Sequence, residues 1–328
     1  MKKGEYIQYS PVFHTFAWVK TLAESPCPIM RCCPRKNREG APMSIDLLQE
    51  KIRKRKSGLL LDLTLFPHEL PEGEGKEEER YASFCRSLLA ELKGSIPALR
   101  FRLSAFALWG PKMLGLLPEL TKEAAALGYY VLLDAPEADS PELAAFGAAG
   151  LLGPDSPYAC DGVVLPMYAG KDVLQQYLPY CKKGNKDVFA LCRTANKSAS
   201  ELQDLLSGSR LAHMAIADQV ARCAAPLMGR YGYACLGLTA AAGQSSSIKT
   251  LRTKYPGLFL LVDGVDLPGG NMKNVSLAFD KLGRGAVYCS GRAVTCAWRQ
   301  AEGMSAVDAA VAEVERQKNA LQRYVTFL

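Results

Sequence analysis

From residue 44 onward, short apolar runs alternate with longer amphipathic segments. The runs are nearly continuous in apolar character, as expected of strands covered on both faces, and they span 58–63, 97–102, 129–134, 161–165, 187–193, 233–238, 258–263 and 284–289. Apolar spacing typical of helices fills the intervals, as at 78–92, 111–126, 171–181, 248–254 and 274–282. Eight such alternations predict an α/β fold, a (β/α)8 TIM barrel of ordinary length.

The two ends of the chain extend this pattern. Residues 305–324 are rich in Ala, Glu and Arg with apolar spacing of three and four, which predicts a C-terminal packing helix. Residues 1–42 precede the pattern, and Met43 resembles a start codon. We expect a single barrel over 43–328, preceded at 1–42 by an N-terminal extension or by a mis-assigned start.

Composition narrows the class of protein. The chain of 328 residues is 48% hydrophobic and 22% charged, which is ordinary for a globular protein. Its 11 cysteines are scattered and are interpreted as reduced thiols. Cys27, Cys32 and Cys33 lack the paired spacing of zinc sites, so no metal is expected. We also expect no cofactor. There is no secretion signal and no apolar run of 18 residues, which predicts a cytoplasmic protein without a membrane span.

The charge pattern bears on the kind of partner. The net charge is +7, and residues 1–42 contribute seven Lys/Arg against three Asp/Glu. A second basic cluster at 51–56 lies on a predicted solvated helix face. Neither cluster is interleaved with aromatic residues, so nucleic acid is not the expected partner. A modest positive field instead suits an anionic small molecule.

Candidate chemistry is concentrated in VLLDAPEAD at 131–139. This apolar run ends in Asp134 and is followed by Asp139, so both carboxylates would lie at the C-terminal end of a barrel strand. That end is where barrel enzymes carry their active sites.

The same stretch resembles the Asp-x-Lys-x-x-Asp signature of the orotidine 5'-phosphate decarboxylase family, in its longer bacterial type. Asp134 and Asp139 hold the carboxylate positions, and Pro136 stands where the family has lysine. The resemblance continues in order along the chain. It includes a first helix at 43–52, LLLD at 59–62, a second-strand segment at 99–111, LCRTAN at 191–196 with ELQD at 201–204, VDGVDLPGG at 262–270, and CSGR at 289–292.

The resemblance implies a network of alternating acids and bases at the rim. In this chain it would contain Asp62, Arg100, Asp134, Asp139 and, in place of the lysine, Pro136. The family's lysine protonates the carbanion left by decarboxylation, whereas proline carries neither charge nor proton. Losing a general acid alone costs roughly 10²–10⁴-fold in rate. The retained Arg100 is a poor proton donor because an arginine pKa lies above about 12.

Contacts to the pyrimidine are also altered. The resemblance assigns the pyrimidine-side loop to Thr194, Ala195 and Asn196, with Ala195 in place of a hydroxyl residue. Pro268 replaces a glutamine that bridges base and phosphate. The asparagine expected after the fourth strand is absent, because Leu165 and Pro166 stand there. A site without these partners should discriminate poorly among bases.

The phosphate end is better preserved. It would consist of backbone N–H groups and a guanidinium in the loops after the seventh and eighth strands, from Gly269, Gly270, Ser290, Gly291 and Arg292. A purely structural interpretation is also open. The glycines would then form tight turns, Arg292 would pair with an acid, and the strand-end aspartates would cap helices or pair with arginines.

Three functional hypotheses follow from the resemblance. The first is a degenerate member that binds a phosphorylated small molecule, such as a nucleoside monophosphate, with little or no decarboxylation. The second is an active decarboxylase with a substitute proton donor, Lys171 or Glu137. The third is a non-catalytic dimer partner that supplies Asp139 to the site of another subunit. A homodimer is expected, or a heterodimer with an active paralogue.

Overall fold

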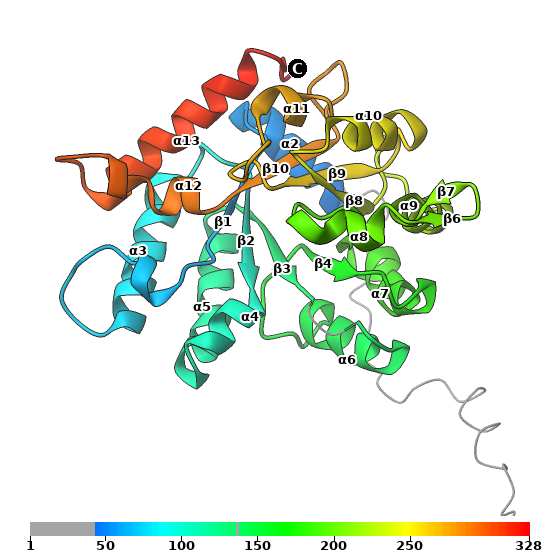
Figure 1. The fold of residues 1–328 in the computed structure, drawn as a ribbon. Helices are drawn as coiled ribbons and strands as arrows, with labels where there is room; N and C mark the ends of the chain where they lie inside the picture. Colours follow the sequence, from blue (N-terminus) through cyan, green and yellow to red (C-terminus); the bar gives the residue numbers. More distant parts are fainter. Residues whose placement is uncertain (1–42, 136–137) are drawn as a thin grey trace, which may run out of the picture. The chain divides into compact units, whose positions relative to one another are not determined.

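The computed structural model describes residues 43–135 and 138–328. Eight parallel strands form a closed barrel in the order β1-β10-β9-β8-β5-β4-β3-β2 (Figure 1). The strands are β1 (Leu59–Asp62), β2 (Ala98–Arg102), β3 (Tyr130–Asp134), β4 (Gly162–Pro166), β5 (Asp187–Leu191), β8 (Leu236–Ala241), β9 (Phe259–Asp263) and β10 (Ala286–Ser290). The predicted (β/α)8 barrel is thereby confirmed.

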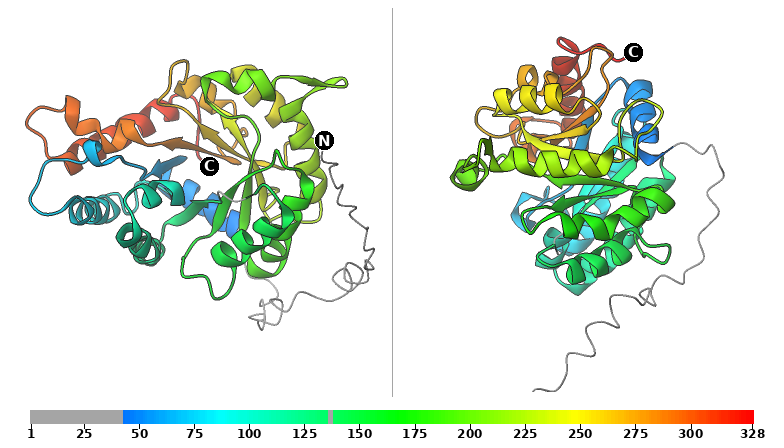
Figure 2. Two further views of the ribbon diagram at one scale, coloured as in Figure 1. Left: turned by 60° about the horizontal axis from the view of Figure 1, so that its bottom comes forward. Right: turned by 90° about the vertical axis from the view of Figure 1, so that its right-hand side faces the viewer.

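Helices fill most of the connections between these strands (Figure 2). The longer ones are α2 (Ser44–Arg55), α3 (Glu77–Glu91), α5 (Pro111–Ala126), α6 (Pro141–Leu152), α7 (Lys171–Gly184), α9 (Ala212–Ala224), α10 (Ser245–Lys254) and α13 (Ala306–Gln322). Shorter helices are α4 (Leu103–Leu108), α8 (Ser200–Gln203), α11 (Met272–Ser276) and α12 (Arg292–Thr295), with 3-10 turns at Pro67–Glu69, Lys197–Ala199 and Ala297–Gln300. A small antiparallel hairpin, β6 (Leu206–Ser207) and β7 (Arg210–Leu211), lies between α8 and α9.

Most predicted element boundaries agree with the structure within two residues. Among the larger differences, α7 extends to Gly184, three residues beyond the prediction, and α10 begins at Ser245, three residues before it. The sixth barrel strand, β8, begins three residues later than the predicted run at 233–238. The helix predicted at 274–282 ends at Ser276, as α11. The Asp280 carboxylate accepts hydrogen bonds from the backbone N–H groups of Leu282 and Arg284, both at 2.8 Å, and so holds a turn in place of a further helical turn.

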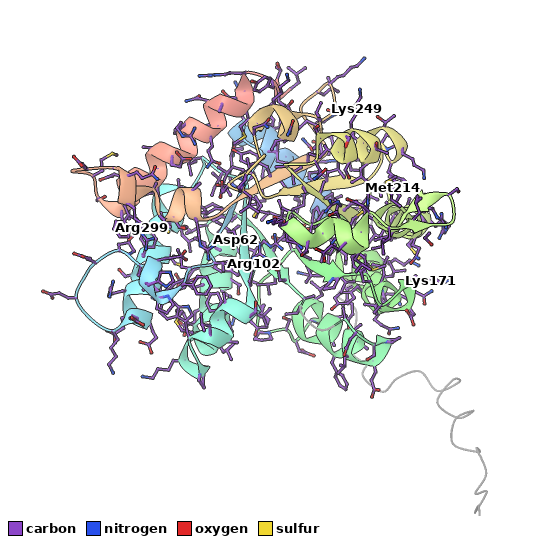
Figure 3. The ribbon with its side chains drawn as sticks, in the orientation of Figure 1. Asp62, Arg102, Lys171, Met214, Lys249 and Arg299 are labelled. Atoms are coloured by element: carbon purple, nitrogen blue, oxygen red, sulfur yellow. The ribbon has the colours of Figure 1, made fainter. Side chains whose placement is uncertain are left out.

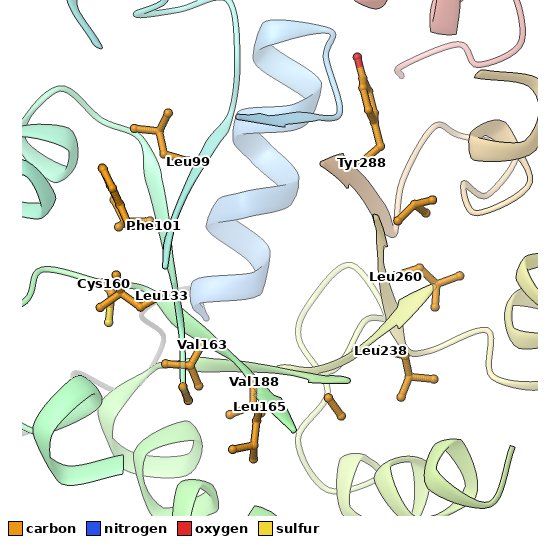
Figure 4. Close-up of a cluster of buried hydrophobic side chains, with 14 of the residues drawn as sticks. Leu99, Phe101, Leu133, Cys160, Val163, Leu165, Val188, Leu238, Leu260 and Tyr288 are labelled. Atoms are coloured by element: carbon orange, nitrogen blue, oxygen red, sulfur yellow. The ribbon is translucent and has the colours of Figure 1, made fainter. Parts of the chain in front are cut away.

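Two apolar layers follow from the alternation of side chains along each strand. Outward-facing residues pack beneath the surrounding helices, as Leu99, Phe101 and Leu133 do in Figure 4. Inward-facing residues fill the barrel, and α2 packs against this inner layer with Ile45, Leu48 and Ile52. The last two are fully buried, and each such burial contributes about 1.5–3 kcal/mol. Helix α2 therefore closes one end of the barrel and leaves the opposite rim for a site.

None of the helices within the described ranges has the length and apolar character needed to cross a bilayer.

Candidate active site

Five charged side chains form an alternating chain of ion pairs at the carboxyl ends of four strands. Arg102 Nη2 lies 2.7 Å from Asp62 Oδ2, and Arg102 Nη1 lies 3.1 Å from Asp134 Oδ2. Arg100 then joins Asp134 to Asp263, with Nε–Oδ1 at 2.7 Å and Nη1–Oδ1 at 3.0 Å. The order is Asp62–Arg102–Asp134–Arg100–Asp263, and we call this set the rim network.

Strand alternation explains why these side chains meet. On β3, Tyr130 and Leu132 belong to the inner layer, and Asp134 follows at the next inward position. The same alternation places Arg100 and Arg102 after inward Ala98 on β2. Polar residues at the last inward positions of parallel strands are thus brought to one rim.

Arg100 is the most deeply buried member of the rim network, with 2% of its side chain exposed. Burial by itself lowers the pKa of Arg100, but the charges of Asp263 and Asp134 outweigh it, so the pKa of Arg100 lies well above its ordinary value. Arg102 behaves in the same way: burial lowers its pKa, Asp62 raises it, and the net direction is upward. Both guanidinium groups are therefore permanent cations.

Asp62 shows the complementary effect. Burial raises the pKa of Asp62, but Arg102, Arg100 and a hydrogen bond from the Thr64 hydroxyl at 2.5 Å lower it below its ordinary value. Beneath it, the Cys289 thiol is buried, and burial together with Asp263 and Asp62 raises the pKa of Cys289 well above its ordinary value. Cys289 is consequently a neutral thiol and not a nucleophile.

Sequence reasoning anticipated Asp62, Arg100 and Asp134 in one network but missed Arg102 and Asp263. A signal was available, because LLLD, VLLD and LLVD are three apolar strands that each end in aspartate, at 62, 134 and 263. Arg102 was also recognisable as the next inward position after Arg100. Both residues lie in segments that carry the resemblance, 99–111 and 262–270, but the resemblance assigned no role to either of them.

The other predicted catalytic positions lie outside the rim network or outside the described residues. Pro136 and Glu137 lie outside the described residues. Asp139 is exposed just ahead of α6 and is not part of the rim network. Lys171 is exposed at the first position of α7, and Figure 3 shows it far from Asp62 and Arg102.

The predicted phosphate-binding groups are engaged by the protein's own carboxylates. Ser290 Oγ donates to Asp266, at 3.0 and 3.2 Å from its two oxygens, and the Gly291 N–H donates to Asp266 Oδ2 at 3.0 Å. The guanidinium of Arg292 forms an ion pair with the buried carboxylate of Glu69. The structure thus brings Ser290, Gly291 and Arg292 to the rim, each with an internal acceptor. The ion pair of Arg292 with an acid agrees with the structural alternative stated from the sequence, whereas the contacts of Ser290 and Gly291 with Asp266 were not anticipated.

The two predicted glycines form a tight turn. Gly269 has a φ of +85°, which favours glycine. The N–H of Gly270 donates to the Leu267 carbonyl at 2.9 Å, so it is already used. A Cβ at Gly270 would lie 2.4 Å from the Gly264 carbonyl oxygen, so no larger residue fits there without movement.

A cavity of about 530 Å³ opens beside the rim network, between the loops after β5, β8 and β9. It brings together the predicted Thr194, Ala195 and Asn196 with Pro268. It is also lined by residues that sequence reasoning did not select: Arg193, Lys197, Ser200, Gly243 and Gln244. No member of the rim network lines this cavity, so the charged chain and the open space are adjacent but distinct.

Within this cavity, the two basic residues differ in their surroundings. Arg193 is buried and forms an ion pair with Asp204 at 2.9 Å. Lys197 is exposed, and no carboxylate of the described ranges lies within ion-pair distance of it. The described residues also contain no grouping of His, Cys, Asp and Glu side chains arranged to hold a metal ion.

Comparison with known proteins places these features in a family. The chain is 28% identical over 232 residues to the orotidine 5'-phosphate decarboxylase of Rhodopirellula baltica, covering 70% of this chain and 77% of that protein. It is 27% identical over 266 residues to the Clostridium kluyveri protein of the same name, covering 79% and 90%.

Solved structures share the fold. The Leishmania donovani OMP decarboxylase superposes with a TM-score of 0.65 at 23% identity, over 85% of this chain and 99% of that one. The Plasmodium berghei orotidine 5'-monophosphate decarboxylase gives 0.67 at 13% identity, over 85% and 98%. The sequence model of the Orotidine 5'-phosphate decarboxylase / HUMPS family matches residues 84–306, well over half of the chain. This protein therefore belongs to the Orotidine 5'-phosphate decarboxylase / HUMPS family.

Proposed function

We propose that this chain is a degenerate family member that does not decarboxylate orotidine 5'-phosphate at a significant rate and that binds a phosphorylated small molecule at its rim. The observation that carries the proposal is the composition of the rim network. Both of its cations are arginines, and each arginine is shared between two aspartates.

Such a network lacks a proton to give. Decarboxylation leaves a carbanion that must be protonated, and an effective general acid has a pKa near the working pH. Arg100 and Arg102 have pKa values raised above that of ordinary arginine. No lysine of the described residues forms an ion pair with Asp62, Asp134 or Asp263.

The charge balance also opposes the reaction. Three aspartates and two arginines give the rim network a formal charge of −1 when all are ionised. A substrate carboxylate and the developing carbanion are both anionic, so they would meet net repulsion where the reaction needs a cation. The arginines offer little compensation, because their N–H groups are already directed at aspartate oxygens.

Binding is supported by the adjacent cavity. Its volume of about 530 Å³ is within the range of small-molecule sites. Exposed Lys197 and the polar Thr194, Asn196 and Gln244 supply positive charge and hydrogen-bonding groups at its wall. The relatives carry the name of an enzyme acting on a nucleoside monophosphate, which is the class of ligand we infer for this cavity.

Two assays test the proposal. Purified protein should decarboxylate orotidine 5'-phosphate no faster than the background reaction, and robust turnover would instead favour an active enzyme with a substitute proton donor.

The second assay measures ligand binding by calorimetry. UMP and AMP should bind weakly and with similar affinity, because Ala195 and Pro268 cannot form base-specific hydrogen bonds through their side chains. Lys197→Ala should weaken both several-fold, whereas Lys249→Ala, an exposed lysine on α10 outside the cavity, should not (Figure 3). Equal loss in both variants would contradict the assignment.

A second candidate function rests on Asp139. Its side chain is exposed at the start of the segment leading into α6, so it is accessible to a second subunit. In that case the chain would be a non-catalytic partner that completes another subunit's site. An active family enzyme carrying alanine at its equivalent aspartate should regain activity when co-refolded with this chain, but not with its Asp139→Ala variant.

A further inference from the structure

Asp266 is held like a bound anion. It lies in the loop after β9, and its carboxylate accepts hydrogen bonds from two successive residues at the end of β10. One donor is the Ser290 hydroxyl, on a residue that is 1% exposed, and the other is the backbone N–H of Gly291. A hydroxyl and an adjacent N–H aimed at one oxyanion are the elements of an anion cradle.

The orientation of the serine proton follows from its other partner. Gln317 Nε2 lies 3.0 Å from Ser290 Oγ and 2.8 Å from Glu313 Oε1. Since a carboxylate only accepts, the nitrogen of Gln317 donates to both atoms. It therefore uses an acceptor site of Ser290, and the serine proton is left for Asp266. The cradle is thus preset to donate outward.

A second carboxylate engages the nearby cation. Arg292 pairs with Glu69, whose side chain is 7% exposed, and also lies over the Phe66 ring at 5.1 Å. Asp266, Glu69 and Arg292 together carry a formal charge of −1. A phosphate dianion approaching this end of the rim would find the Ser290 and Gly291 donors already bonded to Asp266, and it would also be repelled by the excess negative charge.

We propose that Asp266 is an internal anion that occupies the phosphate cradle, so that an external phosphate binds only by displacing it. This inference rests on the proposed function, because it concerns the phosphate end of the same ligand. Asp266 is exposed apart from these contacts. Its loop contains Gly264 and Gly269 with φ of +78° and +85°. The Asp266 carboxylate therefore blocks the Ser290 and Gly291 donors until an external anion that binds them more strongly displaces it.

The test measures inorganic phosphate binding by calorimetry to the full chain and three variants. Asp266→Ala empties the cradle and should bind phosphate at least tenfold more tightly than the unmodified protein, equal to about 1.4 kcal/mol. Glu142→Ala, which removes an exposed negative charge on α6, should leave the affinity unchanged. Asp266→Asn keeps the space filled but loses the charge, so its gain should be smaller than that of alanine.

The opposite results would overturn the inference. Asp266→Ala binding no more tightly than the unmodified protein would show that the carboxylate does not compete, and equal gains for alanine and asparagine would show that occupancy is irrelevant. Thermal unfolding of each variant checks that it is folded. If UMP binds in a Lys197-dependent manner while Asp266→Ala changes nothing, the inference fails and the proposed function stands. If Asp266→Ala binds phosphate more tightly but Lys197→Ala leaves UMP binding unchanged, the inference stands and the assignment of the ligand to the Lys197 cavity fails.

Discussion

Arg100→Met is expected to be among the most destabilising single substitutions at the rim. Arg100 is 2% exposed and donates to both Asp134 and Asp263, with four nitrogen–oxygen distances of 2.7–3.2 Å. Methionine fills much of the same volume, so the loss is mainly electrostatic: two carboxylates remain without their shared cation.

The magnitude follows from the burial of the three groups. Removing one partner of a buried ion pair costs about 3–5 kcal/mol. Asp134 and Asp263 retain 23% and 20% exposure and can recover some hydration, which places the expected loss near the lower limit, about 3 kcal/mol. The matched control is Arg86→Met, which breaks an exposed pair with Glu123 (44% and 38% exposed) and should cost about 0–1 kcal/mol.

Urea unfolding, read with an unchanged slope m, provides the assay. Adding Asp263→Asn to Arg100→Met removes one of the two stranded charges, so the double variant should be more stable than the sum of the single losses predicts, by at least about 1 kcal/mol. A loss for Arg100→Met no larger than that for Arg86→Met would refute this reasoning. Strict additivity in the double variant would refute it as well.

Three further outcomes are expected. Asp62 has a lowered pKa because two guanidinium groups outweigh its burial, so its ionisation stabilises the fold above its unfolded pKa of about 3.9 and this stability is lost as the pH falls further. Arg102→Leu should therefore destabilise the protein at pH 7, by an amount that shrinks as the pH falls below 4 in urea titrations; a constant difference would exclude the linkage. Gly270→Ala should lower the melting temperature because its Cβ would lie 2.4 Å from a backbone oxygen, whereas Gly115→Ala, in open space on α5, should raise stability by about 0.4–1 kcal/mol. Pro136→Lys alone should leave orotidine 5'-phosphate decarboxylation at background, as the arginines of the rim network would remain; measurable rescue would show that one lysine suffices.

The fold could be predicted from the sequence because its signal is local and repeated. Eight apolar runs such as 129–134, separated by amphipathic helices, leave a closed parallel barrel as the natural way to cover every strand on both faces. The polar residues at the ends of these runs could also be identified from the sequence. Asp62 and Asp134 each terminate an apolar strand, and parallel strands bring such ends to one rim.

The pairing of charges at that rim was decided only by the tertiary structure. A strand's sequence shows that Arg100 points inward, but not that its partners are Asp134 and Asp263, since β9 adjoins the site only when the barrel closes. Likewise, Asp266 is present in the segment 262–270 quoted from the sequence. Its contact with Ser290, however, forms only because β9 and β10 are neighbours in the barrel, which brings the loop after β9 to the end of β10. Local patterns determined which groups reach the rim. Which charges neutralise one another depends on distances of about 3 Å between residues far apart in the chain, and these exist only in the folded barrel.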